Sequence, residues 1–313
     1  MQADGVFSGS GMKGIAFAGA IAAAEEAGYS EWARLAGTSA GAIAAMALAV
    51  GYDAAGIREA LEATDYARIA DTGGLLGRFR NLSRRNGLTR GEALWRWIEG
   101  LLRDAPSPAT VFGELDGRLQ VVGCDFAHSR LVVFPEDVSL YEDEWGAQLR
   151  PEEFPIAQAV RISAGYPYFF PPLALRDRTT GKDGVLVDGG VASAFPLFLF
   201  DRRRPRHPTW GFRLHSGLGP ERPSQREIGG LDWPVDMAWG ILETAMNAFD
   251  AREVLSFGDR VVSIPTGDVG TLDFKLSLEQ RRILYQSGHE AGRAFFASRP
   301  SARNAFGEVP LAR

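Results

Sequence analysis

Residues 32–48 read WARLAGTSAGAIAAMAL: a short apolar run, a G-x-S-x-G pentad centred on Ser39, and an alanine-rich run. This order predicts a strand, a tight turn and a helix, with the serine at the apex of the turn. Gly37 and Gly41 let the strand and the helix approach closely around a strained turn, which presents the Ser39 hydroxyl. The first N–H groups of the helix favour negative charge beside that hydroxyl. Ser39 is therefore a candidate nucleophile, with an ordinary glycine-rich turn as the plainer alternative.

A second glycine-rich turn lies upstream. Residues 9–14 read GSGMKG and follow the apolar pair Val6-Phe7. Alone, this pattern fits the dinucleotide fingerprint G-x-G-x-x-G. That fingerprint requires an acidic residue at the end of the second strand, whereas this strand leads into the turn of Ser39. We therefore expect the upstream turn to offer backbone N–H groups to an oxyanion, and the Ser39 turn to supply the attacking oxygen.

A third motif joins an apolar strand to a carboxylate. Residues 185–190 read VLVDGG, so Asp188 ends a short apolar run and two glycines follow it. A lone Asp-Gly-Gly is usually a plain turn. At the end of a buried strand, however, Asp188 is placed to point toward the edge of the sheet where Ser39 is expected.

In this order the three motifs resemble those of the patatin-like phospholipases, which have a G-x-G-x-[KR]-G turn, a G-x-S-x-G elbow and a D-G-[GA] turn. Residues 161–171, RISAGYPYFFP, are similar to the family's R-A-S-x-A-x-P-x-x-F-x-P segment. Phe195-Pro196 follows the aspartate at the family's usual distance, and residues 284–288, LYQSG, resemble a C-terminal helix of bacterial members. The resemblance covers about residues 4–296.

The resemblance implies a serine lipid acyl hydrolase, similar to phospholipase A or a lysophospholipase, that works through an acyl-enzyme. It implies a dyad with Ser39 as nucleophile and Asp188 as general base, a lipid ester or phospholipid as substrate, and neither a cofactor nor a metal. The implied oxyanion hole is the backbone of residues Gly9, Ser10, Gly11, Met12, Lys13 and Gly14, with the charge of the lysine nearby. The implied supports of the elbow and of the aspartate turn are Gly37, Gly41, Gly189 and Gly190.

The sequence departs from the family pattern at two places. Ser10 stands where the family usually has a further glycine, which keeps the residue small. Ser193-Ala194 stands where an asparagine often follows the D-G-G turn. The second change removes a side-chain amide that orients the aspartate loop, so it leaves the support of Asp188 open.

Two other functions stay open. A Ser–Asp–His esterase in the order of the α/β-hydrolases would use Ser39, Asp188 and either His215 or His289. Too few strands precede the elbow for that fold, and His289 is expected in the middle of a helix. The second alternative is a catalytically idle relative that binds a nucleotide or a protein through the same turns. The sequence has no H-E-x-x-H motif and no paired cysteines, which argues against metal catalysis.

The chain has 313 residues and 45% hydrophobic residues, enough for one large core. Its β-α-β-α start favours an α/β fold. We expect a single three-layer α/β/α domain with a mainly parallel central sheet over residues 1–313, with a core at about 4–297 and a tail at 298–313. Expected strands are 4–8, 32–37, 118–125, 130–134, 184–188, 209–215 and 259–264. Expected helices are 13–27, 40–50, 53–64 with Asp53 as N-cap, a helix to about 103 that a Thr89–Glu92 capping box opens, 155–164, 233–257, and 277–297 with Ser277 and Gln280 as its box. Residues 70–88 are expected to be irregular.

Charge and composition limit the partners. A net charge of −5 argues against nucleic acid. Two arginine clusters are either solvated loops or sites of transient contact with phosphates at a membrane surface; they are Arg78, Arg80, Arg84, Arg85 and Arg90, and Arg202, Arg203, Arg204 and Arg206. The single cysteine, Cys124, excludes an intramolecular disulfide and is expected to be buried in a strand. No export signal or run of ~18 apolar residues is found, so a cytoplasmic location is expected. Oligomeric state is not predicted.

The aromatic residues allow two interpretations. Tyr166, Tyr168, Phe169 and Phe170 are either core or the wall of an acyl slot. The tryptophan pairs at 95 and 97, and at 233 and 239, are expected to be core.

Overall fold

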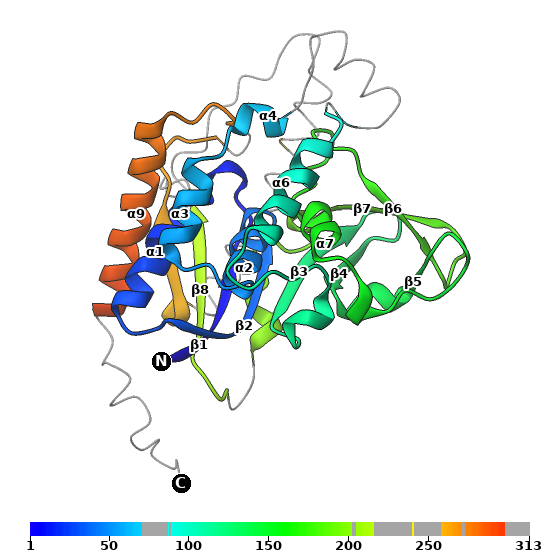
Figure 1. Cartoon of the computed structure of the whole chain (residues 1–313), viewed down its shortest axis with the longest axis horizontal. Coiled ribbons are helices and arrows are strands. Elements are labelled where there is room, and N and C mark those ends of the chain that lie inside the picture. The colour runs from blue at the N-terminus through cyan, green and yellow to red at the C-terminus, as the bar shows by residue number, and fades with distance from the viewer. Residues whose placement is uncertain are drawn as a thin grey trace.

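The computed structural model describes residues 1–70, 87, 89–201, 205–215, 240, 258–270 and 273–297. Their centre is one mixed sheet of nine strands in the order β5-β6-β7-β3-β2-β1-β8-β9, with β4 paired to β3 (Figure 1). The strands are β1 Gln2–Phe7, β2 Glu31–Thr38, β3 Leu119–Asp125, β4 Arg130–Phe134, β5 Tyr141–Glu142, β6 Leu173–Asp177, β7 Asp183–Asp188, β8 Thr209–His215 and β9 Val261–Pro265. The helices are α1 Ile15–Glu26, α2 Ala40–Ala49, α3 Ala54–Glu62, α4 Tyr66–Ala70, α6 Glu92–Arg103, α7 Ile156–Ser163 and α9 Leu278–Ala297.

The sheet has a parallel half and an antiparallel half. Strands β3, β2, β1, β8 and β9 run parallel to one another. Every pairing of β4, β5, β6 and β7 is antiparallel. The expectation of a mainly parallel sheet is right for the half that carries Ser39 and wrong for the other half. The antiparallel neighbours β3 and β4, and β6 and β7, are joined by short turns, whereas parallel neighbours need long crossovers.

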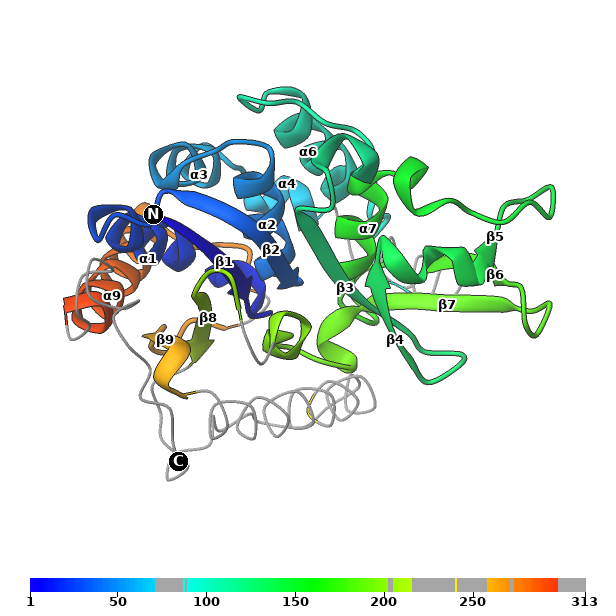
Figure 2. The ribbon, with the colours of Figure 1, turned by 90° about the horizontal axis from the view of Figure 1, so that it is seen from below.

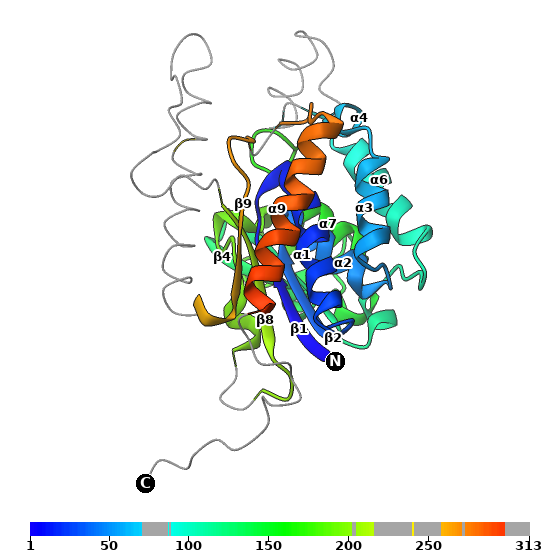
Figure 3. The same ribbon diagram turned by 90° about the vertical axis from the view of Figure 1, so that its left-hand side faces the viewer.

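Among the described residues, the α-helices that pack on the parallel half cover one of its faces (Figure 3). Helices α1 and α9 pack almost backbone to backbone, because each has a glycine at the contact. A Cβ on Gly19 of α1 would lie 2.0 Å from the Tyr285 carbonyl oxygen, and a Cβ on Gly288 of α9 would lie 1.9 Å from the Ala16 carbonyl oxygen. The view from below shows α1, α2, α3 and α6 on the same side of the sheet (Figure 2).

The opposite face has a small core of its own. Phe195, Leu197 and Phe200, from the chain after β7, pack with Val6 and Ala36 of the sheet. The central sheet with flanking helices that we expected is therefore present. The described part of the second outer layer is this irregular segment with its 3-10 turn, Leu197–Phe200.

The predicted elements agree with the structure to within a few residues. The Asp53 carboxylate accepts the Gly56 N–H at 2.7 Å, and Ser277 and Gln280 form their capping box. The box predicted at Thr89 is wrong. Gly91, at a φ of 74°, precedes α6, and the Thr89 hydroxyl is buried without a hydrogen bond.

Several predictions lie outside the described residues: the irregular stretch at 71–86, the tail at 298–313, and the long helix at 233–257, of which only Gly240 is described, as helical. Within the described chain, no helix is both long and apolar enough to cross a membrane. Cys124 is buried in β3, as predicted, and burial raises the pKa of its thiol to about 11.

Candidate active site

The elbow between β2 and α2 holds Ser39 in a strained conformation. Its φ of 54° and ψ of −122° lie in a region that non-glycine residues rarely adopt. The neighbouring glycines have no room for a side chain. A Cβ on Gly37 would lie 2.2 Å from the Gly41 carbonyl oxygen, and a Cβ on Gly41 would lie 2.2 Å from that of Phe7. The pentad therefore lets α2 begin directly against the ends of β1 and β2, as the sequence predicted.

Ser163 fixes the elbow from the end of α7. The Ser39 N–H donates to the Ser163 hydroxyl oxygen at 2.9 Å, and that hydroxyl donates to the Val122 carbonyl oxygen at 2.5 Å. Ser163 is fully buried. Our sequence analysis did not single it out, although it lies in the RISAGYPYFFP stretch. A polar residue at the end of a helix, on its buried face, could have indicated that Ser163 forms a structural hydrogen bond.

Strand β3 brings Asp188 to the elbow. Thr38 of β2 pairs with Val122 of β3, and Gly123 of β3 pairs with Asp188 of β7. A Cβ on Gly189 would lie 2.1 Å from the Val122 carbonyl oxygen, so the turn after β7 is pressed against β3. Two motifs about 150 residues apart in sequence thus meet through one intervening strand.

The Asp188 carboxylate is buried and only partly hydrogen-bonded. Its Oδ1 accepts the Gly190 N–H at 2.8 Å, whereas its Oδ2 has no hydrogen-bond partner. Burial raises the pKa of Asp188 to about 7, against the opposing effects of the Gly190 N–H and the nearby Ser39 hydroxyl. The hydroxyl thus lies close enough to influence Asp188 but forms no hydrogen bond of standard geometry with Oδ2. Catalytic hydrogen bonds are often loose before substrate binds.

In the turn at 9–14, one backbone N–H is used in a structural hydrogen bond, whereas others belong to residues that line the pocket of Ser39. The Gly9 N–H donates to the Ala194 carbonyl oxygen at 2.7 Å, so it is not free for an oxyanion. Gly11 has a φ of 66° and begins a 3-10 turn, Gly11–Lys13. The N–H groups of Gly11 and Met12 have no acceptor within that turn, and both residues line the same pocket as Ser39. Gly11, Met12 and the neighbouring Ser10 remain the candidate donors.

Ser193 and Ala194 support the site through their backbone. The Thr38 hydroxyl donates to the Ser193 carbonyl oxygen at 3.0 Å, and the Ala194 carbonyl oxygen accepts the Gly9 N–H. The loop after Asp188 thus ties the elbow to the glycine-rich turn without a side-chain amide.

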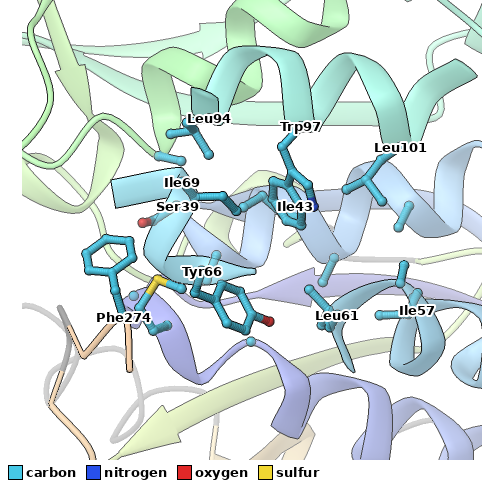
Figure 4. Close-up of a pocket in the computed structure, with 18 of the residues that line it drawn as sticks. Ser39, Ile43, Ile57, Leu61, Tyr66, Ile69, Leu94, Trp97, Leu101 and Phe274 are labelled. Atoms are coloured by element: carbon cyan, nitrogen blue, oxygen red, sulfur yellow. The ribbon is translucent and has the colours of Figure 1, made fainter. Parts of the chain in front are cut away.

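An apolar pocket opens at Ser39 and continues between the helices (Figure 4). Its free volume is about 90 Å³, so it is narrow. Phe274 lies near the serine and Trp97 further in (Figure 4), and Tyr166 and Phe170 also line the pocket. Tyr166 and Phe170 are thus both buried and part of the pocket wall. Phe169 is buried against Phe274, and Tyr168 is 46% exposed.

The histidines have other neighbours. His289 contacts Glu26 at 2.8 Å, and His128 contacts Asp125 at 2.8 Å. Burial lowers the pKa of His215, and the charges of Arg213 and Lys13 lower it further, so His215 lies near Lys13. The described groups that shift the pKa of Asp188 include no histidine.

One group of possible metal ligands lies elsewhere in the sheet. Asp125, His128 and Asp177 bring their ligand atoms within 4.8 Å of one another. The Arg130 guanidinium donates to both carboxylates, so a side-chain cation already lies between them. Of the two arginine clusters, the described members Arg90 and Arg206 are exposed, and the rest lie outside the described residues.

Comparison with known proteins places these features in one family. Residues 5–201 match the family model described as patatin-like phospholipase. The uncharacterized protein YqhO of Bacillus subtilis (strain 168) is 35% identical over 295 residues, covering 92% of this chain and 96% of YqhO. The crystal structure of VipD from Legionella pneumophila superposes with a TM-score of 0.58 at 19% identity, covering 95% of this chain and 67% of VipD. ExoU, in its heterodimeric complex with SpcU from the type III secretion system of Pseudomonas aeruginosa, superposes with a TM-score of 0.51 at 19% identity; 95% of this chain is covered, but only 51% of that one. VipD and ExoU thus share the fold of this chain.

Proposed function

The chain belongs to the patatin-like phospholipase family, and we propose that it is a serine lipid acyl hydrolase of the phospholipase A or lysophospholipase kind. Family membership supports hydrolysis of a lipid ester. The proposal adds the residues and the mechanism. It rests above all on one observation: the strained Ser39 lies where an apolar pocket opens and beside a buried carboxylate with a free oxygen, Oδ2 of Asp188.

In the first half-reaction, Ser39 Oγ attacks the ester carbonyl carbon while Asp188 accepts the hydroxyl proton. The negative charge that develops on the carbonyl oxygen is stabilised by the N–H groups of Gly11 and Met12. The tetrahedral intermediate collapses, and the alcohol leaves with the proton from Asp188. An acyl-enzyme remains on Ser39. The narrow apolar pocket holds the acyl chain away from water.

In the second half-reaction, Asp188 takes a proton from water as the water oxygen attacks the acyl carbonyl carbon. Collapse of this intermediate returns the proton to Ser39 Oγ and releases a carboxylic acid. A carboxylate is ordinarily a weak base toward an alcohol. Burial brings the pKa of Asp188 to about 7, near the working pH, where a general base is most effective.

Labelling by a fluorophosphonate tests the nucleophile directly. We expect one adduct on wild-type protein, on the peptide that contains Ser39, and none on Ser39→Ala. Ser39→Ala should also lose ester hydrolysis and keep its circular dichroism spectrum. An adduct on a different peptide, or unchanged turnover in the variant, would contradict the assignment.

The idle-relative alternative uses the same glycine-rich turn for a different ligand. Backbone N–H groups at a helix N-terminus also bind phosphates. Calorimetry with NAD separates the two functions. Absence of binding supports the hydrolase, and tight binding that a Gly11→Val change removes would overturn this role of the turn.

A further inference from the structure

The pocket follows one side of helix α2 away from Ser39. Ile43, Ala44 and Ala47 of this helix line it in succession. Figure 4 shows Ser39 and Phe274 at one end and Ile57 and Leu101 at the other. The eight helical residues that follow Ser39, from Ala40 to Ala47, rise about 12 Å, which matches an extended chain of about ten carbons. The narrow shape suits one unbranched chain.

Tyr52 and Leu101 lie at the deep end of this pocket. The Tyr52 hydroxyl donates to the Leu101 carbonyl oxygen at 3.0 Å, and the Tyr52 N–H donates to the Ala47 carbonyl oxygen at 3.0 Å. The tyrosine is thus bound to the end of α2 on one side and to α6 on the other. These two bonds fix the position of its ring.

Beyond this wall lies a second cavity, the outer groove, between α3 and α6. The side chains that line both the pocket and the outer groove are Tyr52, Ala60, Ile69, Trp97 and Leu101. Of these, Ile69 lies near Ser39 and Leu101 at the far end, next to its hydrogen-bond partner Tyr52 (Figure 4). The Trp97 ring is itself held in place, because its Nε1–H donates to the Thr64 hydroxyl at 3.0 Å. The outer groove is wider, with a free volume of about 720 Å³, and is polar along its rim, which includes Glu59, Asp65, Arg68 and Asp104. A few side chains therefore separate an apolar pocket from a groove with a polar rim.

We propose that Tyr52, together with Leu101, limits the length of the acyl chain that the enzyme accepts to about ten carbons. This inference rests on the proposed function and adds the substrate class, esters of medium-length straight-chain acids. Each methylene that enters the pocket contributes by burial, about fourfold in kcat/KM at most. The gain stops at the tyrosine, because a longer chain must displace a hydrogen-bonded ring or remain partly outside. Tyr52 is thus a specificity-determining residue.

The test is a series of p-nitrophenyl esters from four to sixteen carbons, compared by kcat/KM. For wild-type protein we expect a steep rise to about ten carbons and no gain, or a fall, beyond. Tyr52→Ala joins the pocket to the outer groove, so the rise should continue to longer chains, with the change in KM rather than in kcat. Leu101→Ala shortens a second side chain of the wall at the deep end and should shift the optimum in the same direction.

Two controls make the result specific. Tyr52→Phe keeps the ring and removes only its hydrogen bond to Leu101, so it should shift the length optimum less than Tyr52→Ala does. Trp95→Ala removes a large aromatic residue from the outer side of α6, where Trp95 contacts Glu99 and does not line the pocket. It should leave both the activity and the length profile unchanged.

Failure of this inference is distinct from failure of the proposed function. If esters are hydrolysed but Tyr52→Ala and Leu101→Ala keep the wild-type profile, the length limit is wrong and the hydrolase stands. If no ester is hydrolysed and Ser39 takes no fluorophosphonate, the proposed function fails. The pocket is then tested with decanoic and hexadecanoic acids by calorimetry, where wild-type protein should bind the shorter acid better and Tyr52→Ala should lose that preference. If wild-type protein and Tyr52→Ala show the same relative affinity for the two acids, the inference is overturned.

Discussion

Asp125 and Asp188 are both buried, and they lie on paired strands of the same sheet, β3 and β7. Their carboxylates have opposite environments. Asp125 accepts hydrogen bonds from His128, Tyr141, Arg130 and the Val185 N–H. Burial acts to raise the pKa of Asp125, but the bonds from His128, Tyr141 and Arg130 outweigh it and lower the pKa. Asp188 has one N–H partner and a raised pKa.

The difference separates a structural carboxylate from a candidate catalytic one. A buried charge is tolerated when it is paired and fully hydrogen-bonded. Asp125 meets that condition and, through Val185, holds β7 against β3. Asp188 does not, so its charged form is costly and its free oxygen can take a proton. Perturbed carboxyl groups of this kind are typical of functional sites.

The largest expected effect is that of Asp188→Asn. Loss of a general base costs ~10²–10⁴ in rate, and the loss should not add to that of Ser39→Ala because the two act as a unit. At pH 8 the free energy of unfolding of the variant should be higher than that of wild type, because the variant buries no charge at this position. The difference should be up to about 4 kcal/mol, since burial raises the pKa of Asp188 from 3.8 to about 7 and each pKa unit is worth about 1.4 kcal/mol. Turnover and chemical denaturation measure the two effects. An active variant would show that Asp188 is not the general base. A variant less stable than wild type at pH 8 would show that the Asp188 carboxylate stabilises the fold, as that of Asp125 does.

Gly11→Val comes next, because it tests the open donors of the turn. A valine at a φ of 66° is strained, and displacement of one oxyanion donor costs ~10²–10³ in kcat. Ser10→Gly, a return to the family pattern, should be neutral in the same assay. Wild-type turnover by Gly11→Val would exclude this turn as the oxyanion hole.

The pH dependence should differ between the two carboxylates. Asp188 must be ionised to act, so kcat/KM should rise about tenfold per pH unit up to about 7 and then level off. Because the folded protein holds that proton more tightly than the unfolded chain, Asp188 makes stability fall between about pH 4 and 7. Asp125 and Asp177 have lowered pKa values, about 2 for Asp177, and so contribute stability above about pH 4 that is lost in stronger acid. Denaturation of Asp188→Asn, which should lack the slope between pH 4 and 7, checks the assignment.

Arg130→Met should affect stability more than chemistry. It leaves Asp125 and Asp177 without their shared cation, and breaking a buried ion pair costs about 3–5 kcal/mol. Denaturant unfolding should show that loss, while the protein that remains folded keeps the fluorophosphonate reactivity of Ser39. Loss of labelling in a folded variant would show that the two regions are coupled.

The smallest effects are expected from the histidines and from chelation. Single alanine substitutions at His128, His207, His215 and His289 should leave turnover essentially unchanged in folded protein. EDTA should also have no effect, because Arg130 already lies between the carboxylates of Asp125 and Asp177. Inactivation by His215→Ala without unfolding would replace the dyad by a triad. Inhibition by EDTA that calcium reverses would mean that a metal takes part.

The sequence by itself determined the elements around Ser39 and the family. The pentad, the alanine-rich helix after it and the cap at Asp53 depend on local sterics and local hydrogen bonds, which a short stretch of sequence encodes. The antiparallel half was not foreseen as such, since strand direction depends on which segments pair. The failed capping box at Thr89 has a similar cause: the buried Arg161 guanidinium donates to the Gly91 carbonyl oxygen at 3.3 Å, a contact 70 residues away in the chain.

Only the tertiary structure decided which polar groups of the site are free. The sequence grouped Gly9 with Gly11, but a contact with Ala194 occupies the first N–H and leaves the second open. It also could not show that Ser163 fixes the elbow, that Oδ2 of Asp188 has no partner, or that Tyr52 of the pocket lining is bonded to Leu101. Each of these depends on residues distant in sequence that burial brings together. Pattern and spacing encode the backbone of a site, whereas its electrostatics and its depth follow from packing.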